Sequence, residues 1–104
     1  MSLDFSLIRR QPQEVAHANI THNMTELWYA LGIYEILYNG QGKYASDVYN
    51  QLHRALLRLE VDRAKWEAYD SPNGWGTYDG ALRFLTIIVK ACEEFPNARI
   101  DIDK

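Results

Sequence analysis

Residues Thr77–Glu94 have the sequence TYDGALRFLTIIVKACEE, which gives the clearest indication of the architecture. On a helix its polar side chains form one narrow stripe, made of Asp79, Arg83, Thr86, Lys90 and Glu93. A helix that is apolar around most of its circumference is buried between other elements. Pro96 stops the helix shortly after Glu94. We therefore expect a central helix that begins at Thr77 or Asp79 and ends near Glu94.

Both ends of the chain alternate between apolar and polar residues, which is the pattern of a half-buried strand. The alternation covers Leu3–Ile8 near the start of the chain and Ala98–Asp103 at its end. Glu14–Ile20 reads as a further strand, and its short connection to Leu3–Ile8 predicts a hairpin. The inward face of Glu14–Ile20 stays open between two sets, Val15/His17/Asn19 and Ala16/Ala18/Ile20.

Helical spacing occupies the middle of the chain. Met24, Leu27, Trp28 and Leu31 form a first apolar stripe, with Thr21 and Thr25 as candidate N-caps and Gly32 at its C-terminal end. The remaining helices are expected over Ile33–Tyr38, over Ala45–Val61 with Ser46 as its cap, and from Asp62 to Tyr69.

The order of these elements predicts an α+β fold. Strands at both ends of the chain favour a three-stranded antiparallel sheet with helices on one face. A length of 104 residues is that of a single domain, here 1–104. Residues 1–3 are read as an end that either frays or is foreign to the natural sequence.

The composition excludes several classes of protein. With 47% apolar and 24% charged residues, the chain is neither collagen-like nor disordered. A net charge of −3 disfavours binding to nucleic acid through phosphate contacts. No apolar run approaches the ~18–20 residues of a membrane span. Because Met1-Ser2-Leu3-Asp4 also lacks the features of a signal peptide, the sequence predicts a cytoplasmic protein without membrane contact.

No metal or cofactor is expected. His17, His22 and His53 do not match the spacing of a known metal motif. Cys92 is the one cysteine, which excludes an intramolecular disulfide, and it falls on the apolar stripe of the last helix. We expect Cys92 to be an inert core residue.

Two segments are candidates for a functional site. The first, Asn19-Ile20-Thr21-His22-Asn23-Met24-Thr25, gathers small polar side chains where a strand meets a helix. His22 is the member able to exchange a proton near neutral pH. The alternative is that these residues only cap the helix and hydrogen-bond the turn.

The second segment is Ser71-Pro72-Asn73-Gly74-Trp75-Gly76-Thr77-Tyr78-Asp79-Gly80. Its glycines allow positive φ or close backbone approach around two aromatic residues. It is not a dinucleotide-binding fingerprint, and Asp79 would oppose a phosphate at the start of the helix. The segment predicts either a recognition loop that presents Trp75 and Tyr78 or a turn in which Trp75 closes the edge of the core.

The joint pattern resembles a group of short, uncharacterised bacterial and phage-encoded proteins. The residues that carry the resemblance are Asn19-Ile20-Thr21-His22-Asn23, Gly32-Ile33-Tyr34, Pro72-Asn73-Gly74-Trp75-Gly76-x-Tyr78, and Cys92 before a final strand. The resemblance extends from about Ala18 to the end of the chain. It implies a stand-alone protein of the bacterial cytoplasm or of a prophage, and it implies no activity.

Three functional hypotheses follow from these residues. The leading one is a small binding module for a protein, a peptide or a small polar ligand, whose site is Asn19, His22, Asn23, Asn73, Trp75 and Tyr78. An alternative is an enzyme in which His22 is the general acid or base. Asp79 would then orient His22 or act as a second carboxylate, and Asn19 or Asn23 would donate hydrogen bonds to a developing charge. A third is a structural subunit that forms homo-oligomers through its exposed aromatic residues. Separately, the chain order predicts that the Asn19–Asn23 and Asn73–Asp79 segments lie side by side, because two helices begin near one end of the sheet.

Overall fold

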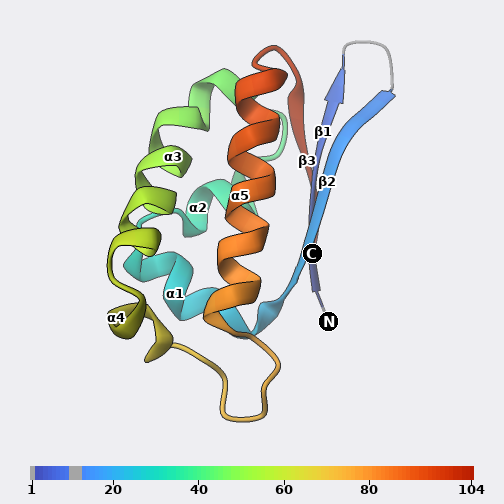
Figure 1. The fold of residues 1–104 in the computed structure, drawn as a ribbon. Coiled ribbons are helices and arrows are strands. Elements are labelled where there is room, and N and C mark those ends of the chain that lie inside the picture. Colours follow the sequence, from blue (N-terminus) through green and yellow to red (C-terminus); the bar gives the residue numbers. More distant parts are fainter. Residues whose placement is uncertain (1, 10–12) are drawn as a thin grey trace.

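The computed structural model describes residues 2–9 and 13–104 and has the predicted order of strands and helices (Figure 1). The strands are β1 (Ser2–Arg9), β2 (Gln13–Thr21) and β3 (Arg99–Asp103). The helices are the short 3-10 helix η1 (His22–Met24), α1 (Thr25–Ala30), α2 (Tyr34–Asn39), α3 (Ala45–Val61), α4 (Arg63–Glu67) and α5 (Tyr78–Glu94). None of the helices in the described ranges is long and apolar enough to cross a membrane.

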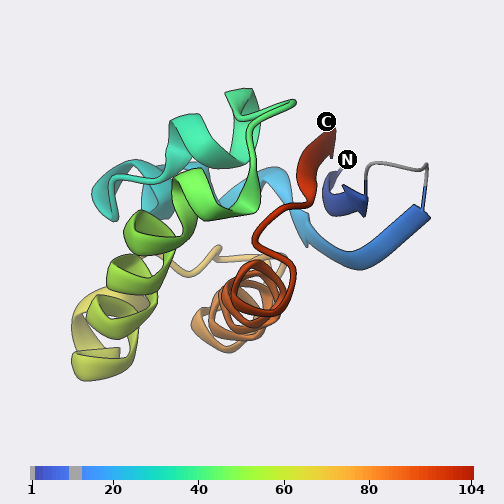
Figure 2. The same cartoon turned by 90° about the horizontal axis from the view of Figure 1, so that it is seen from above.

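The three strands form one antiparallel sheet in the order β2-β1-β3, which confirms the predicted α+β architecture. Seen from above, the helices lie on one side of the sheet (Figure 2). Phe5 on the central strand pairs with Ala18 of β2 and with Ile102 of β3, and these side chains face the helices. Leu3 pairs with Ile20 and is fully buried.

The burial of its side chains shows which face of β2 points toward the core, a question that the sequence did not decide. Ala18 and Ile20 are buried and Ala16 packs against the core, whereas His17 and Asn19 are exposed. The register shifts between Leu7 and Ile8 of β1, which pair with Ala16 and Glu14. This bulge places Glu14 on the outer face, where its carboxylate lies 3.1 Å from His17 Nδ1.

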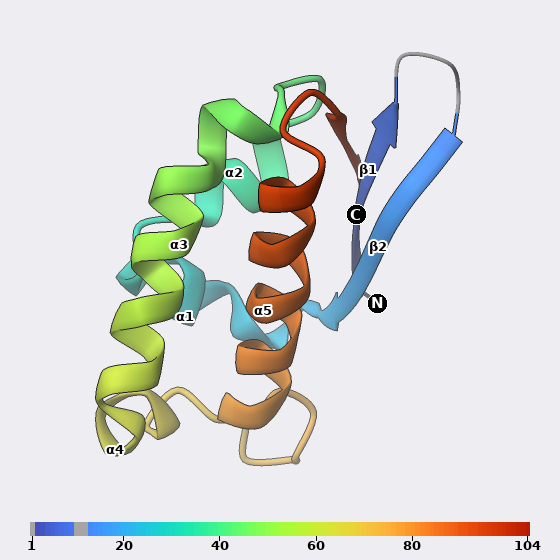
Figure 3. The same ribbon diagram turned by 45° about the horizontal axis from the view of Figure 1, so that its top comes forward.

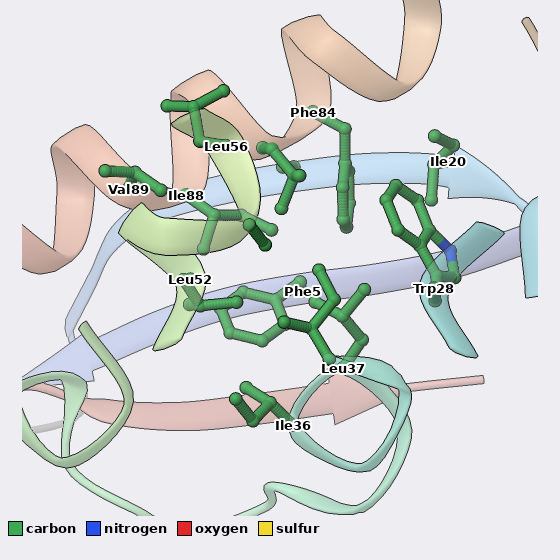
Figure 4. Packing of buried hydrophobic residues seen from close by; sticks show 14 of the residues in the cluster. Phe5, Ile20, Trp28, Ile36, Leu37, Leu52, Leu56, Phe84, Ile88 and Val89 are labelled. Carbon is green, nitrogen blue, oxygen red and sulfur yellow. The ribbon is translucent and has the colours of Figure 1, made fainter. Parts of the chain in front are cut away.

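Helix α5 is central, as its apolar circumference predicts. It packs against both α3 and β2, and it buries Phe84, Leu85 and Ile88. Trp28 of α1 meets Phe84 with ring centroids 5.7 Å apart, and Figure 4 shows this pair among the other core side chains. Burial of these large side chains is the main force that joins the helical layer to the sheet.

The helix ends follow local hydrogen-bonding rules, with two corrections. Thr21 caps η1, as predicted, but the prediction of Thr25 as a cap was wrong, because Thr25 is the first residue of α1 and follows the N-cap Met24. Thr77 caps α5, because its hydroxyl accepts from the Gly80 N–H at 3.1 Å. Gly32 has the positive φ of +76° expected after a helix. The prediction of Ser46 as the cap of α3 was wrong. The cap is Tyr44, whose N–H donates to the Asp47 carboxylate at 3.1 Å.

Cys92 lies in the core at 1% exposure, and burial raises the pKa of its thiol to about 12. A protonated, buried thiol reacts slowly, because the thiolate is the nucleophile. We expect a thiol reagent such as a chromogenic disulfide to label the native protein slowly at pH 8 and the denatured protein rapidly. The ratio of the two rates measures the protection. Rapid labelling of the native protein would contradict the core position.

Candidate functional site

The loop between α4 and α5 projects from one end of the molecule (Figure 1). Its backbone closes on itself, because the Ser71 N–H donates to the Gly76 carbonyl at 2.8 Å and the Gly74 N–H donates to the Ser71 carbonyl at 3.0 Å. The Asn73 carboxamide oxygen accepts from the Trp75 N–H at 2.9 Å and from the Ser71 hydroxyl at 2.5 Å. These bonds give the loop one defined shape.

This loop contacts the strand–helix junction through Asn23. The side-chain amide of Asn23 donates to the Trp75 carbonyl at 2.7 Å. Gly76 lies against the same junction: a Cβ at this position would stand 2.7 Å from Met24 Sδ and 3.3 Å from Asn23 Cβ. The close approach requires glycine, as does the φ of +137° at Gly76. The predicted juxtaposition of the two segments is therefore present, and Asn23 provides its hydrogen bond.

Trp75 is the exposed tryptophan of this chain. Its residue surface is 70% exposed, whereas Trp28 and Trp66 are 0% and 2% exposed. An exposed indole leaves a large apolar area in contact with water. Trp75 does not close the core edge, which was the alternative role predicted for it.

A groove of about 660 Å³ runs beside the loop. Asn23 and Glu26 line it from the α1 side, Lys65 lines it from α4, and Asp70 and Ser71 line it from the start of the loop. Asp70 also accepts from the Tyr78 N–H at 2.7 Å, so its carboxylate helps to fix the entry into α5. The groove thus offers amide, hydroxyl and charged groups beside the start of the loop that carries Trp75.

Three of the predicted site residues lie elsewhere. Asn19 is on the outer face of the sheet, where its amide donates to Asp4 at 2.9 Å. Tyr78 is buried at 4% exposure, and its hydroxyl donates to the Leu59 carbonyl at 2.8 Å, so the loop does not present its ring. Asp79 accepts two hydrogen bonds from Arg63, at 3.1 and 3.2 Å, which raise the pKa of Arg63.

His22 has a different partner from the one the enzyme hypothesis needs. Its Nδ1 lies 2.8 Å from the hydroxyl of Tyr38, a buried residue whose pKa is raised to about 12 by loss of hydration and by the nearby Tyr34. Tyr38 therefore keeps its proton at neutral pH. His22 and Asp79 each bond to another residue, and within residues 2–9 and 13–104 no hydrogen bond or ion pair joins them.

A stack of tyrosine rings continues from this pair, and it was not predicted from the sequence. Tyr34 stacks on Tyr38 with centroids 4.6 Å apart, and on Tyr29 with centroids 4.0 Å apart. Tyr34 and Tyr38 are four residues apart on α2, the spacing that places side chains on one helix face. Tyr29 lies five residues before Tyr34, on the other side of the Gly32 turn, so the geometry of that turn brings the two rings together.

The described residues contain no group of three or more His, Cys, Asp or Glu side chains placed to hold a metal ion. The chemistry that the arrangement does offer is that of recognition: an exposed indole, a fixed backbone and a polar groove. Comparison with protein-family models, curated proteins and solved structures gives no match to this chain, so its function has to be inferred from this geometry.

Proposed function

We propose that this chain is a small binding module that docks a protein or peptide through Trp75. The observation that carries the proposal is the 70% exposure of the Trp75 residue on a loop whose backbone is fixed by its own hydrogen bonds. Tryptophan is among the residues most enriched at the energetic centres of protein interfaces. Burial of this indole by a partner would remove a large apolar area from water.

The fixed loop supports this proposal energetically. Ordering a flexible loop on binding costs roughly 0.5–1.5 kcal/mol for each immobilised side chain, and a preformed loop avoids part of that cost. Asn73 and Asn23 hold the backbone on both sides of Trp75, through the Trp75 N–H and the Trp75 carbonyl. The polar groove next to the loop supplies the rim groups that protein interfaces use for specificity.

The enzyme hypothesis has less support. A nucleophile or an acid–base pair needs side chains within hydrogen-bond reach of each other. Cys92 is buried and its pKa is raised to about 12, which makes it a poor nucleophile. His22 is bonded to a buried tyrosine instead of a carboxylate. Recognition by Trp75 therefore remains the function that the geometry supports best.

A photo-crosslinking amino acid at Pro72, an exposed position of the same loop, tests the proposal and leaves Trp75 in place. The same replacement at Tyr29, which is 61% exposed, is the matched control. The protein crosslinked from position 72 in cells is then purified and titrated with the parent chain. We expect Trp75→Ala to weaken that complex by about 30-fold, the effect of roughly 2 kcal/mol at an interface centre. Thermal unfolding should stay within a few degrees of the parent protein.

The controls separate the remaining outcomes. Tyr29→Ala should leave the affinity unchanged. An unchanged affinity of Trp75→Ala would contradict the proposal. Recovery of the chain itself as the crosslinked partner, with a concentration-dependent mass in light scattering, would favour the homo-oligomer hypothesis. Asn23→Ala tests whether Asn23 contributes to binding or only stabilises the loop. A lower melting temperature with normal binding would assign Asn23 to loop stability alone.

A further inference from the structure

The end of β1 and the starts of α3 and β3 lie at the opposite end of the molecule from the loop between α4 and α5 (Figure 3). A second hollow lies among these segments. Its volume is about 880 Å³, and its lining is Ile8, Arg9, Tyr44, Ser46, Asn97 and Arg99. It shares Arg9 and Asn97 with a smaller hollow of about 430 Å³ beside the end of α5. Nothing in the proposed function uses this end of the molecule.

Two guanidinium groups line the larger hollow, and each is held against an aromatic ring. The Arg99 guanidinium lies 4.7 Å from the centre of the Tyr44 ring and donates to the Tyr44 hydroxyl at 2.9 Å. The Arg9 guanidinium lies 5.2 Å from the centre of the Phe95 ring. Stacking restricts these long side chains, so less rotational freedom is lost when they bind a ligand.

Neither guanidinium is neutralised within residues 2–9 and 13–104, because no carboxylate of this part of the chain comes within 4.0 Å of Arg9 or Arg99. Arg63 shows the contrast, since it pairs with both Glu67 and Asp79. Two positive charges therefore face one hollow in a protein whose net charge is −3. Such a local excess of positive charge attracts an anion.

The backbone around the hollow is tied together. Tyr44 bridges to Arg99, the Ala45 N–H donates to the Ala98 carbonyl at 2.8 Å, and the Ser46 N–H donates to the Pro96 carbonyl at 2.9 Å. These bonds hold the start of α3 against the start of β3. They also occupy the first amide groups of α3, so an anion would be bound by side chains and not by the helix terminus.

We infer that this hollow binds the phosphate group of a small phosphorylated molecule. A guanidinium matches phosphate with two parallel hydrogen bonds, and two of them suit a doubly charged group. The Ser46 hydroxyl and the Asn97 amide supply neutral donors in the same lining. The volume exceeds that of one phosphate and falls in the range of ligand pockets, about 300–1,000 Å³, so it accommodates the rest of the molecule. Glu94 lines only the smaller hollow, where it would repel an anion.

Titration with inorganic phosphate and with pyrophosphate, followed by amide chemical shifts at constant ionic strength, tests this inference. We expect saturable shifts around residues 44–46 and 97–99, and tighter binding of pyrophosphate because it carries more charge. Arg99→Gln and Arg9→Gln should each weaken binding about tenfold or more, since each removes a charge-assisted contact. Tyr44→Phe should weaken it less, because it removes only the hydrogen bond that holds Arg99.

Arg83→Gln is the matched control, because Arg83 is an exposed arginine of α5 outside this lining and should leave the affinity unchanged. All of these replacements are at exposed residues, and unchanged melting temperatures would show that the variants fold. Shifts that do not saturate, or an affinity for pyrophosphate that Arg9→Gln and Arg99→Gln leave unaltered, would overturn the inference. Binding of a single-stranded oligonucleotide without any binding of pyrophosphate would also overturn it, in favour of a nucleic-acid surface.

Discussion

Replacing Trp28 by alanine is expected to destabilise the protein by about 3–5 kcal/mol, the usual cost of removing a buried aromatic side chain. Trp28 is 0% exposed, and its ring packs against Phe84 of the central helix α5 (Figure 4). The cavity left behind would lie where α1 meets α5. With about 4–8 °C lost per kcal/mol in a domain of this size, the melting temperature should fall by more than about 12 °C.

Phenylalanine replacements at two tryptophans provide the matched comparison. Trp28 Nε1 is buried and has no acceptor within the described part of the chain, whereas Trp66 Nε1 donates to the Arg58 carbonyl at 2.8 Å. Trp28→Phe and Trp66→Phe remove the same atoms, but only the second leaves a carbonyl without its donor. We expect Trp66→Phe to cost about 1–3 kcal/mol more in denaturant unfolding. Equal costs would show that the Trp28 N–H has a partner such as a buried water.

The fold could be predicted from the sequence because its elements are marked locally. Alternation in Leu3–Ile8 identified the central strand, and the narrow polar stripe of Thr77–Glu94 identified the buried helix. Thr77 and Gly32 act at helix ends through short-range hydrogen bonds and backbone angles. These signals depend on neighbouring residues alone, so they can be recognised without knowledge of the tertiary structure.

The features that could not be predicted depend on contacts between distant residues. The inward face of β2 was ambiguous because Val15 made the first set plausible as well as the more apolar second set. The burial of Ala18 and Ile20 against the helices decides it. Tyr78 lies only three residues after Trp75. It is nevertheless the first residue of α5, and its ring points into the core toward Leu59. Whether a side chain at the start of a helix points into the core or into solvent depends on how the helix packs.

The candidate site also combines features that the sequence predicts with features that depend on contacts between distant residues. Asn23 was predicted to meet the loop because two helices begin near one end of the sheet, and its bond to the Trp75 carbonyl confirms this contact. Asn19 belongs to the same stretch of sequence, but the alternation of β2 turns it to the outer face beside Asp4. The lining of the hollow brings together Arg9, near the start of the chain, and Arg99, near its end. No local pattern in the sequence indicates this hollow.

The second large effect is expected for Gly76→Ala. This replacement should lower the free energy of unfolding and also weaken recognition by Trp75. The new Cβ would lie 2.7 Å from Met24 Sδ, and Met24 is 1% exposed, so its side chain has little space to move. The φ of +137° adds backbone strain for any residue with a Cβ. Overpacking and strain together should cost about 2–4 kcal/mol.

Gly74→Ala is the control that separates the two causes. Gly74 also has a positive φ, +78°, but a Cβ there would meet nothing within 4 Å. It should therefore show only the strain, about 1–2 kcal/mol. In Gly76→Ala the loop must also move away from η1, which stretches the Asn23–Trp75 hydrogen bond and displaces the indole. We expect weaker binding of the partner by Gly76→Ala even well below its melting temperature, and nearly normal binding by Gly74→Ala. Equal melting temperatures for the two variants would contradict the close approach of the loop to Met24, and normal binding by a destabilised Gly76→Ala would show that recognition does not depend on that approach.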